Sequence, residues 1–178
     1  PQGGEMEQAI ISGIAHDKSE AKITIVGVPD RTGVAARIFQ SIADADINID
    51  MIVQNVSAAA TGLTDISFTL PRDEGVDATA ILQKLQGEVG YASIQYDDQI
   101  GKLSLIGAGM RSHPGITATF FGAMSEAGIN IEMISTSEIR ISIICRQADV
   151  ERGAKAAHAA FGLDADSNEA VVYGGTGR

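Results

Sequence analysis

The sequence has little of the chemistry that enzymes and nucleic-acid-binding proteins commonly use. Its one cysteine, Cys145, cannot form a disulfide within the chain, which fits a reducing compartment. Lysine and arginine number 13 against 23 aspartates and glutamates, and the formal net charge is −10. No basic run offsets this charge, so we expect the chain to bind neither nucleic acid nor an anionic membrane surface.

Candidate catalytic groups are equally sparse. The histidines, His16, His113 and His158, form no triad and no metal-ligand spacing with Cys145. Cys145 lies between apolar and strand-forming residues, so we interpret it as a buried structural thiol. His158 lies in an apolar helical stretch, which favours a surface or packing role. We therefore expect no catalytic site, no metal site and no cofactor in this chain.

Long apolar segments are also missing. No run reaches the length needed to cross a membrane, and no secretory signal is recognisable. These features predict a cytoplasmic protein. Hydrophobic residues make up 44% of the chain and charged residues 20%, which is typical of a folded globular protein.

What the sequence does contain is an internal duplication. Lys22 opens Lys-Ile-Thr-Ile-Val-Gly-Val, and Lys102 opens the similar Lys-Leu-Ser-Leu-Ile-Gly-Ala. Residues 45–51 then match residues 127–133. The offset between the copies changes in the loop where 29–33 is answered by the longer 110–115. Because loops tolerate insertions, this pattern indicates two copies of one small domain.

Each copy predicts the order β-α-β-β-α-β, that of a ferredoxin-like unit. The first copy is expected to form strands at 22–28, 48–56, 64–70 and 92–97, and helices at 33–45 and 75–89. The second is expected to form strands at 102–108, 130–137, 140–146 and 169–173, and helices at 115–127 and 149–161. The expected fold is α+β, with two tandem units whose antiparallel sheets carry helices on one face.

The domain limits follow from the repeat. We expect a first domain at 17–99 and a second at 100–178. An additional apolar segment, 9–16, precedes the first copy and is expected to join the second domain as a strand. Strand 22–28 is fairly apolar on both faces, which indicates that the sheets pack against further modules.

The loop from strand to helix in each copy supports two readings. In one, Asp30 or Thr32 simply caps the helix and Gly33 lets the chain turn. In the other, the free amides and positive end of the helix attract a carboxylate, while Asp30 takes an ammonium group. A site with both features suits a zwitterionic amino acid.

Two further segments could contact a ligand. Asn48-Ile49-Asp50 and Asn130-Ile131-Glu132 each begin a predicted strand, and could either form a turn or read the α-amino and α-carboxyl groups of an amino acid. Gly107-Ala108-Gly109 resembles the start of a dinucleotide fingerprint, but Ser112 replaces the third glycine. The expected antiparallel sheet also differs from the parallel sheet of that fold.

Specific motifs resemble one known family. They include Ser19-Glu20-Ala21-Lys22, Val53-Gln54-Asn55-Val56-Ser57, Gly107 to Gly115, Ile134 to Ser142 with its Ser-Glu-Ile-Arg strand, and the tail Val172 to Arg178. From Met6 onward the chain resembles the regulatory β subunit, or C-terminal tandem ACT region, of actinobacterial aspartate kinase.

The resemblance implies a regulatory subunit that does no chemistry alone. Aspartate kinase phosphorylates the β-carboxylate of aspartate with ATP, in a catalytic domain that this chain lacks. The resemblance implies a homodimer in isolation and an α2β2 assembly with the catalytic α subunit. The effectors would be L-threonine and L-lysine, which act together in concerted inhibition and bind where ACT domains of two chains meet.

The same resemblance assigns the binding residues. The threonine site would comprise Asp30, Gly33, Val34, Ala35 and Gln54 of one chain with Asn130 and Ile131 of the other. The second site, expected for lysine, would comprise Met110, Ser112, His113, Gly115, Ile116 and Thr117 with Asn48, Ile49 and Asp50, walled by Thr136, Ser137 and Glu138. Two alternatives stay open: a Rossmann-like nucleotide-binding enzyme, and a scaffold that assembles without ligands.

Overall fold

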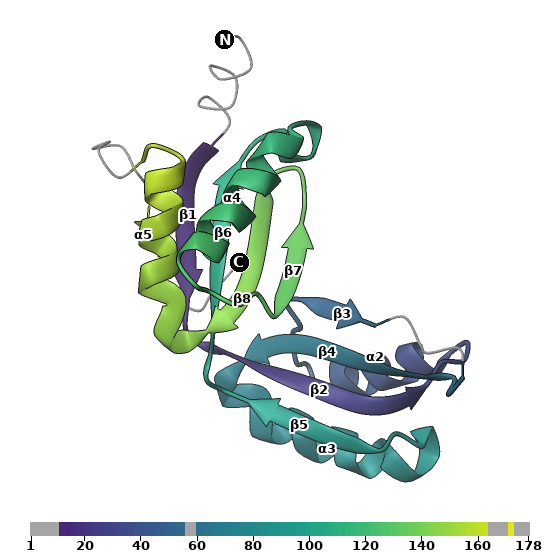
Figure 1. Ribbon diagram of the computed structural model, residues 1–178. Coiled ribbons are helices and arrows are strands. Elements are labelled where there is room, and N and C mark those ends of the chain that lie inside the picture. The colour runs from purple at the N-terminus through teal and green to yellow at the C-terminus, as the bar shows by residue number, and fades with distance from the viewer. Residues whose placement is uncertain (1–10, 56–59, 164–170, 173–178) are drawn as a thin grey trace. The chain divides into compact units, whose positions relative to one another are not determined.

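The chain folds into two compact units. The computed structural model describes residues 11–55, 60–163 and 171–172. The first unit is Glu20–Asp98, and the second joins Pro1–Ser19 to Gln99–Arg178. The chain therefore crosses between the units twice, at Ser19–Glu20 and at Asp98–Gln99. Figure 1 labels the elements of both units.

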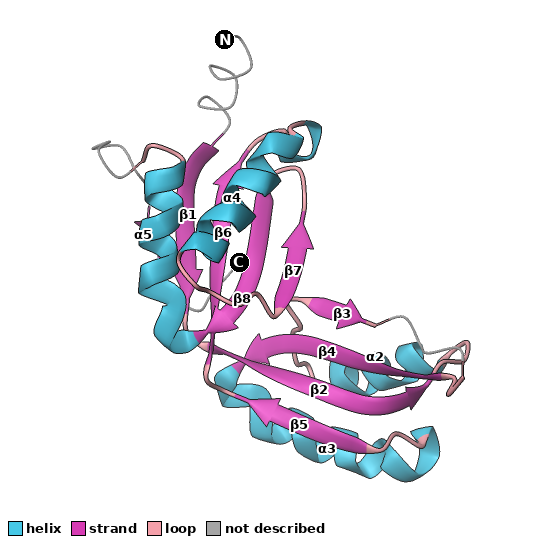
Figure 2. Cartoon of the chain, in the orientation of Figure 1, coloured by secondary structure: helices cyan, strands magenta, loops and turns pink. Residues whose placement is uncertain are grey.

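The first unit has the predicted ferredoxin-like order. Its elements are β2 (Glu20–Pro29), α2 (Val34–Asp44), β3 (Ile52–Gln54), β4 (Leu63–Pro71), the 3-10 turn η1 (Arg72–Glu74), α3 (Gly75–Val89) and β5 (Ser93–Asp97). The strands form an antiparallel sheet in the order β3-β4-β2-β5. Both helices lie on one face of this sheet (Figure 2).

The second unit repeats this order with one difference. Its elements are β1 (Ile11–Asp17), β6 (Ile100–Gly107), η2 (Met110–Ser112), α4 (Pro114–Glu126), β7 (Met133–Thr136), β8 (Arg140–Arg146), η3 (Gln147–Asp149), α5 (Val150–Ala160) and β9 (Val171–Val172). The sheet order is β7-β8-β6-β1-β9. The N-terminal strand β1 lies antiparallel to β6, and β9 pairs in parallel with β1.

Strand β1 thus takes the position that β5 holds in the first unit. The cross-strand neighbours agree, because Lys22 lies opposite Asp97 on β5 and Lys102 lies opposite Asp17 on β1. Opposite charges at facing positions favour this pairing. Since β1 fills the position next to β6, the last strand is placed at the sheet edge. The predicted strand 169–173 is therefore an edge strand beside β1, and its residues 169, 170 and 173 lie outside the described part of the chain.

Each unit has its own apolar core between its helices and its sheet. In α2 the apolar stripe of the sequence buries Ile38 and Ile42 fully. In β2, Ile23 and Ile25 are buried while Thr24 and Val26 on the opposite face are half-buried. Phe39 packs edge-on against the buried Phe68 with ring centroids 5.6 Å apart. Full burial of one such side chain stabilises the fold by roughly 1.5–3 kcal/mol.

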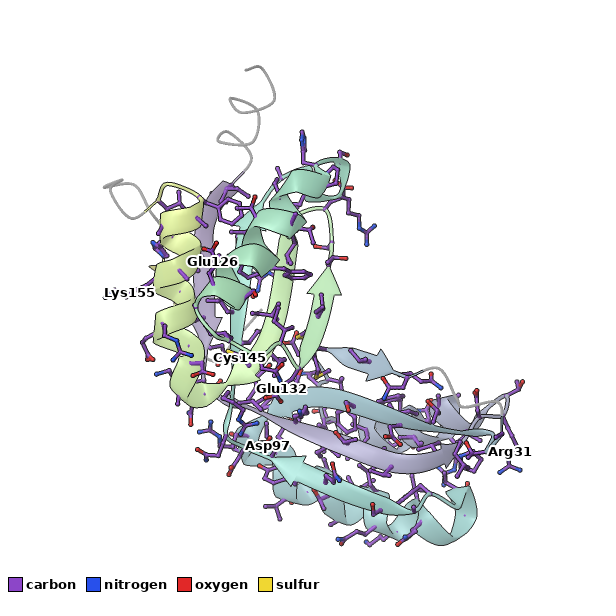
Figure 3. All side chains as sticks on the ribbon, in the orientation of Figure 1. Arg31, Asp97, Glu126, Glu132, Cys145 and Lys155 are labelled. Carbon is purple, nitrogen blue, oxygen red and sulfur yellow. The ribbon has the colours of Figure 1, made fainter. Side chains whose placement is uncertain are left out.

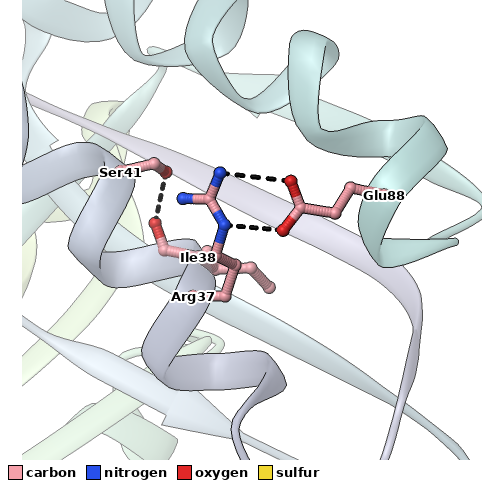
Figure 4. Close-up of polar contacts among 4 residues, drawn as sticks. All are labelled: Arg37, Ile38, Ser41 and Glu88. Carbon is pink, nitrogen blue, oxygen red and sulfur yellow. Dashed lines mark hydrogen bonds and ion pairs between the residues drawn. The ribbon is translucent and has the colours of Figure 1, made fainter.

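Polar contacts complete each unit. Arg37 on α2 donates two hydrogen bonds to the Glu88 carboxylate on α3, at 2.6 and 3.1 Å, as Figure 4 shows. On the sheet face away from the helices, the Thr24 and Ser67 hydroxyls lie 2.8 Å apart. In the second unit the buried hydroxyls of Ser104 and Ser142 lie 2.7 Å apart.

Several sequence predictions need correction in detail. The strands predicted at 48–56 and 130–137 are shorter, and Asn48 and Asn130 precede them instead of beginning them. Before β3 the backbone is held partly by a side chain, because the Met51 amide donates to the Thr69 hydroxyl at 3.0 Å. Neither Asp30 nor Thr32 caps α2; Gly33 is its N-cap residue, at φ 92°, without a side-chain cap bond.

Candidate functional site

The first candidate loop connects β2 to α2. The Asp30 amide donates to the Gly62 carbonyl at 2.9 Å, and the Val34 amide donates to the Arg31 carbonyl at 3.3 Å. Asp30, Thr32 and Gly33 are exposed, whereas Val34 is half-buried. Figure 3 labels Arg31, which lies in this loop. Amides in the first turn of a helix have no acceptor within the helix, so this end presents donors to solvent or to a ligand.

A β-bulge directs β2 into this loop. The register between β2 and β4 shifts between Ile25 and Val28, and Gly27 has φ 71°. The Gly27 amide donates to a carboxylate oxygen of Asp65 on β4 at 3.0 Å. Glycine adopts this backbone conformation without strain. The bulge and the Asp65 carboxylate therefore fix the position at which the chain leaves β2 and enters the loop at Asp30.

The end of β3 lies at the same end of the first sheet. Pro29 pairs with Leu63, and the neighbouring Thr64 hydroxyl donates to the Asn55 carbonyl just beyond β3. Gln54 is exposed at the last position of β3. The predicted residues Asp30, Gly33, Val34, Ala35 and Gln54 therefore belong to one end of the first unit, separated by the single strand β4.

The second candidate loop, between β6 and α4, has a different construction. Met110 is buried within the turn η2, and Gly109 before it has φ 66°. The Met110 amide donates to the Glu138 carbonyl, and the Gly107 amide to the Ile139 carbonyl, each at 2.9 Å. Arg111 donates through Nη2 to the Thr136 carbonyl at 3.3 Å. Backbone carbonyls between Thr136 and Ile139 therefore accept hydrogen bonds from three residues of this loop.

Ser137 stabilises the turn from 137 to 140. Its amide donates to the Arg140 carbonyl at 2.8 Å, and its hydroxyl oxygen accepts from the Arg140 amide at 3.1 Å. The structure thus brings the predicted Thr136, Ser137 and Glu138 next to the loop of Met110 and Ser112. His113 is the N-cap residue of α4, with Pro114 at the first helical position. Gly115, Ile116 and Thr117 follow in the first turn of the helix.

The remaining predicted residues lie elsewhere within their units. Asn48, Ile49 and Asp50 follow the C-terminal end of α2, and Asn130 and Ile131 follow that of α4. A helix of 11 or 13 residues spans roughly 15–20 Å, so each set is separated by about this distance from the loop that opens its helix. Each predicted site combines residues of the first unit with residues of the second, so neither unit holds a whole predicted site by itself.

Two contributing residues were missed in the sequence. Asp65 fixes the bulge at Gly27, and Arg111 ties the second loop to β7. An acidic residue inside an otherwise apolar and threonine-rich strand was the available signal for Asp65. Arg111 occupies the same place in the second copy as Arg31 in the first, but no spacing rule indicates its carbonyl acceptor.

Cys145 and His158 both lie inside the second unit. Cys145 is fully buried on β8, as the sequence predicts, and burial raises the pKa of its thiol to about 11. His158 is also buried, so it is a packing residue. Among the described residues no cluster of histidine, cysteine and acidic side chains could hold a metal ion. No described helix is long and apolar enough to cross a membrane.

The nucleotide-binding alternative is wrong on the geometry of the sheet. Gly107 ends β6, and both neighbours of β6, β1 and β8, run antiparallel to it. A dinucleotide fingerprint requires a parallel β-α-β unit at this point. The fold is the ferredoxin-like one that the repeat predicts.

Comparison with known proteins agrees with that fold. A model of the ACT domain matches residues 23–86 and 103–161. A solved structure of aspartokinase alpha and beta subunits superposes with a TM-score of 0.80 at 46% identity, and the match covers 86% of this chain and 99% of that one. The regulatory subunit of aspartate kinase from Thermus flavus superposes equally well, with a TM-score of 0.80 at 36% identity over 85% and 99%.

The chain belongs to the ACT-domain regulatory region of aspartate kinase. Aspartokinase from Mycolicibacterium smegmatis is 57% identical over 173 residues, which cover 97% of this chain but 41% of that protein. The ACT region thus spans less than half the length of the curated relatives that it matches. The family predicted from the sequence motifs is confirmed.

Proposed function

We propose that this ACT region senses L-threonine and L-lysine and thereby controls the phosphorylation of aspartate. The observation that carries the proposal is the duplication: each unit has a loop that enters a helix N-terminus at the end of the sheet where an edge strand also ends. The domains would be those expected from the repeat, 17–99 and 100–178 with the N-terminal strand 9–16.

The first site offers the groups that a zwitterion needs. Helix N-terminal amides near Gly33 and Ala35 favour a carboxylate, and the exposed Asp30 carboxylate favours an ammonium group. Gln54 at the strand end can both donate and accept a hydrogen bond, which suits the hydroxyl of threonine. Half-buried Val34 and Ala35 offer apolar surface to its methyl group.

A second chain would complete each site. Asn130 and Ile131 lie at the far end of their own unit from its loop, so they can act in a threonine site only by meeting the loop of another unit. A ligand held between two chains couples its binding energy to their association. We propose a homodimer for the isolated chain and an α2β2 assembly with a catalytic subunit, in line with the solved alpha and beta subunits of the related aspartokinase.

The second site would take lysine. It would use the loop of Met110, Ser112 and His113 with Gly115, Ile116 and Thr117, and with Asn48, Ile49 and Asp50 of the other chain. Thr136, Ser137 and Glu138 would form its wall. The exposed Glu138 carboxylate supplies a negative charge for the second ammonium group of lysine.

Titration calorimetry of the purified dimer with L-threonine tests the proposal, with D-threonine as the ligand control. Asp30→Asn and Gln54→Ala are each expected to weaken binding at least tenfold, since the first removes the charge that would pair with the ligand ammonium and the second removes a hydrogen-bonding group. Asp77→Asn is the matched control, because it removes the same charge from an exposed position on α3. Unchanged affinity in both loop variants would contradict the site.

The same titration separates the sensor from a scaffold. If an intact dimer, verified by sedimentation, binds neither L-threonine nor L-lysine, the chain alone is an assembly element. Binding that then returns on addition of the catalytic subunit would assign the sensor to the complete enzyme.

A further inference from the structure

A pair of buried histidines lies where the N-terminal strand meets the last helix. His16 on β1 is 9% exposed and His158 on α5 is 7% exposed. Both belong to the second unit, and β1 and α5 lie side by side (Figure 1). Beyond the end of β1, the Lys18 ammonium pairs with the Glu151 carboxylate in the first turn of α5. The same junction therefore combines two imidazoles with an exposed ion pair.

The charges facing His16 partly oppose one another. Burial is the main cause that lowers the pKa of His16, and the neighbouring Lys18 and His158 lower it further. Glu151 on α5 and Asp17 on β1 act in the opposite direction. From β6 the residue opposite His16 is the apolar Leu103. The structure therefore favours the neutral imidazole, because burial, together with Lys18 and His158, outweighs the attraction of Glu151 and Asp17 for the charged form.

The first unit has a tyrosine in place of a histidine at this junction. Tyr96 on β5 lies opposite Ile23 as His16 lies opposite Leu103, so the two side chains occupy equivalent positions. Tyr96 contacts the start of α3, where a Cβ on Gly75 would lie 2.4 Å from its ring. The unit Glu20–Asp98 contains no histidine at all. The same strand position thus carries an imidazole in one unit and a phenol in the other.

We propose that protonation of His16 releases β1 from the sheet of the second unit, so that the junction of β1 with α5 is an acid-sensitive latch. Release would remove the buried Ile11 and Ile14 from the core and free the antiparallel pairing with β6. Local opening of a terminal strand costs less than global unfolding, so a single proton can shift its population.

The sign follows from proton linkage. His16 binds a proton less readily in the closed state than in an opened state with the usual imidazole pKa near 6.5. The latch is therefore at full strength above pH 6.5 and weakens as the pH falls below that value. Each proton gained on opening raises the opening constant by up to tenfold per pH unit, until His16 also titrates in the closed state.

Amide hydrogen exchange of the full chain between pH 7.5 and 5 tests this latch. After correction for intrinsic exchange rates, the protection of β1 amides is expected to fall by up to tenfold per pH unit below 6.5. Protection of β5 amides is expected to stay level, because the equivalent junction holds Tyr96. His16→Gln should flatten the β1 profile, whereas His113→Gln, outside the junction, should leave it unchanged.

Two measurements can overturn the latch. Parallel loss of protection in β1 and β5, or a β1 profile that persists in His16→Gln, would assign the acid response to the fold as a whole. If His16→Gln does not fold, the NMR titration of the wild-type imidazole decides. Titration of His16 below 6.5 supports the latch, and titration at or above that value excludes it.

Discussion

The two units solve one packing problem with different side chains. Where the first strand, the third strand and the second helix of each unit meet, the first unit buries Ala21, Leu70 and Gly75. The second unit places Gly101, Cys145 and Val150 at the equivalent positions. Two side chains are smaller and one is larger. Protein interiors are packed as densely as organic crystals. The three side chains together therefore fill a similar volume in both units, although the larger side chain sits at a different position in each.

The strand-to-helix loops of the two units are also held by different hydrogen bonds. In the first unit a bulge with Gly27 at positive φ leads into the loop, and the Asp65 side chain satisfies the glycine amide. In the second unit β6 pairs with β8 without a register shift, and a backbone carbonyl satisfies the Gly107 amide. The second loop is also tied to β7 through Arg111. The two duplicated loops are thus held by different hydrogen bonds.

The largest expected contrast concerns Cys145, which replaces the aliphatic Leu70 of the first unit. With its pKa at about 11 instead of 9.0, its thiolate population at pH 8 is lower by about 100-fold. We expect negligible reaction of the native chain with a disulfide reagent and full reaction after unfolding. A Cys145→Ala, Ser93→Cys variant, which moves the thiol to an exposed edge strand, should react at once. Rapid labelling of native Cys145 would show that the second unit opens readily.

Gly101→Ala should destabilise the second unit by overpacking its core. An added Cβ would lie 2.0 Å from Cγ2 of the stiff, fully buried Val150. Such overpacking costs about 1–3 kcal/mol of the free energy of unfolding. Protection against amide exchange in β6 and β8 would report the loss, and adding Val150→Ala should restore part of it.

Gly75→Ala is the matched change in the first unit. The added Cβ would lie 2.4 Å from the Tyr96 ring, but Tyr96 is 39% exposed and its ring can turn outward. The loss of protection in β2 and β4 should therefore be smaller than that caused by Gly101→Ala in its own unit. Equal losses would mean that surface exposure does not relieve the contact.

Gly27→Ala tests the bulge. The φ of 71° costs about 1–2 kcal/mol for an L-residue, and the new Cβ would lie 3.0 Å from that of Ala92. The first unit should lose stability, measured by denaturant unfolding with exchange readout, and L-threonine binding should weaken with it. Gly107→Ala, at a position without positive φ, is the control and should be milder.

The smallest expected effect belongs to Arg37 and Glu88. The Arg37 hydrogen bond holds the pKa of the Glu88 carboxyl below its usual range, so the stabilisation exists above that range and is lost as the pH falls through the lowered pKa. Both side chains are about half-exposed, so Glu88→Gln should change the thermal midpoint only slightly. A high-salt buffer should abolish the difference, and a large salt-independent change would indicate a further role for Glu88.

The sequence predicts most of the fold because its periodic segments are long and well punctuated. The predicted limits of α3 and β8, 75–89 and 140–146, match the structure. Asn48 to Met51 were misjudged as strand because Thr69 satisfies that backbone with its side chain as well as its carbonyl. β9 pairs in parallel with β1 because β1, and not β9, occupies the place beside β6. Local strand propensity does not show which of two strands takes one place in a sheet.

The candidate site was predictable only in part. The duplication marks both loops, so Asp30, Gly33 and Met110 to Gly115 could be found from repeated spacing. Asp65 could not, because its role depends on the bulge that places the Gly27 amide against it. Spacing also gives no information on which residues of a second chain meet these loops. The symmetry of an assembly cannot be deduced from the spacing of motifs within one chain.

The double crossing between the units sets an order of events during synthesis. Glu20–Asp98 is a continuous segment, so the first unit can fold as soon as Asp98 has left the ribosome. Strand β1 is made before it, but within the described residues its strand partners are β6 and β9, which are made afterwards. At roughly 5–20 residues per second, β1 must remain unpaired for several seconds while a complete domain forms behind it. A nascent chain of this protein therefore carries an open strand that a chaperone or a second copy can reach before its own sheet exists.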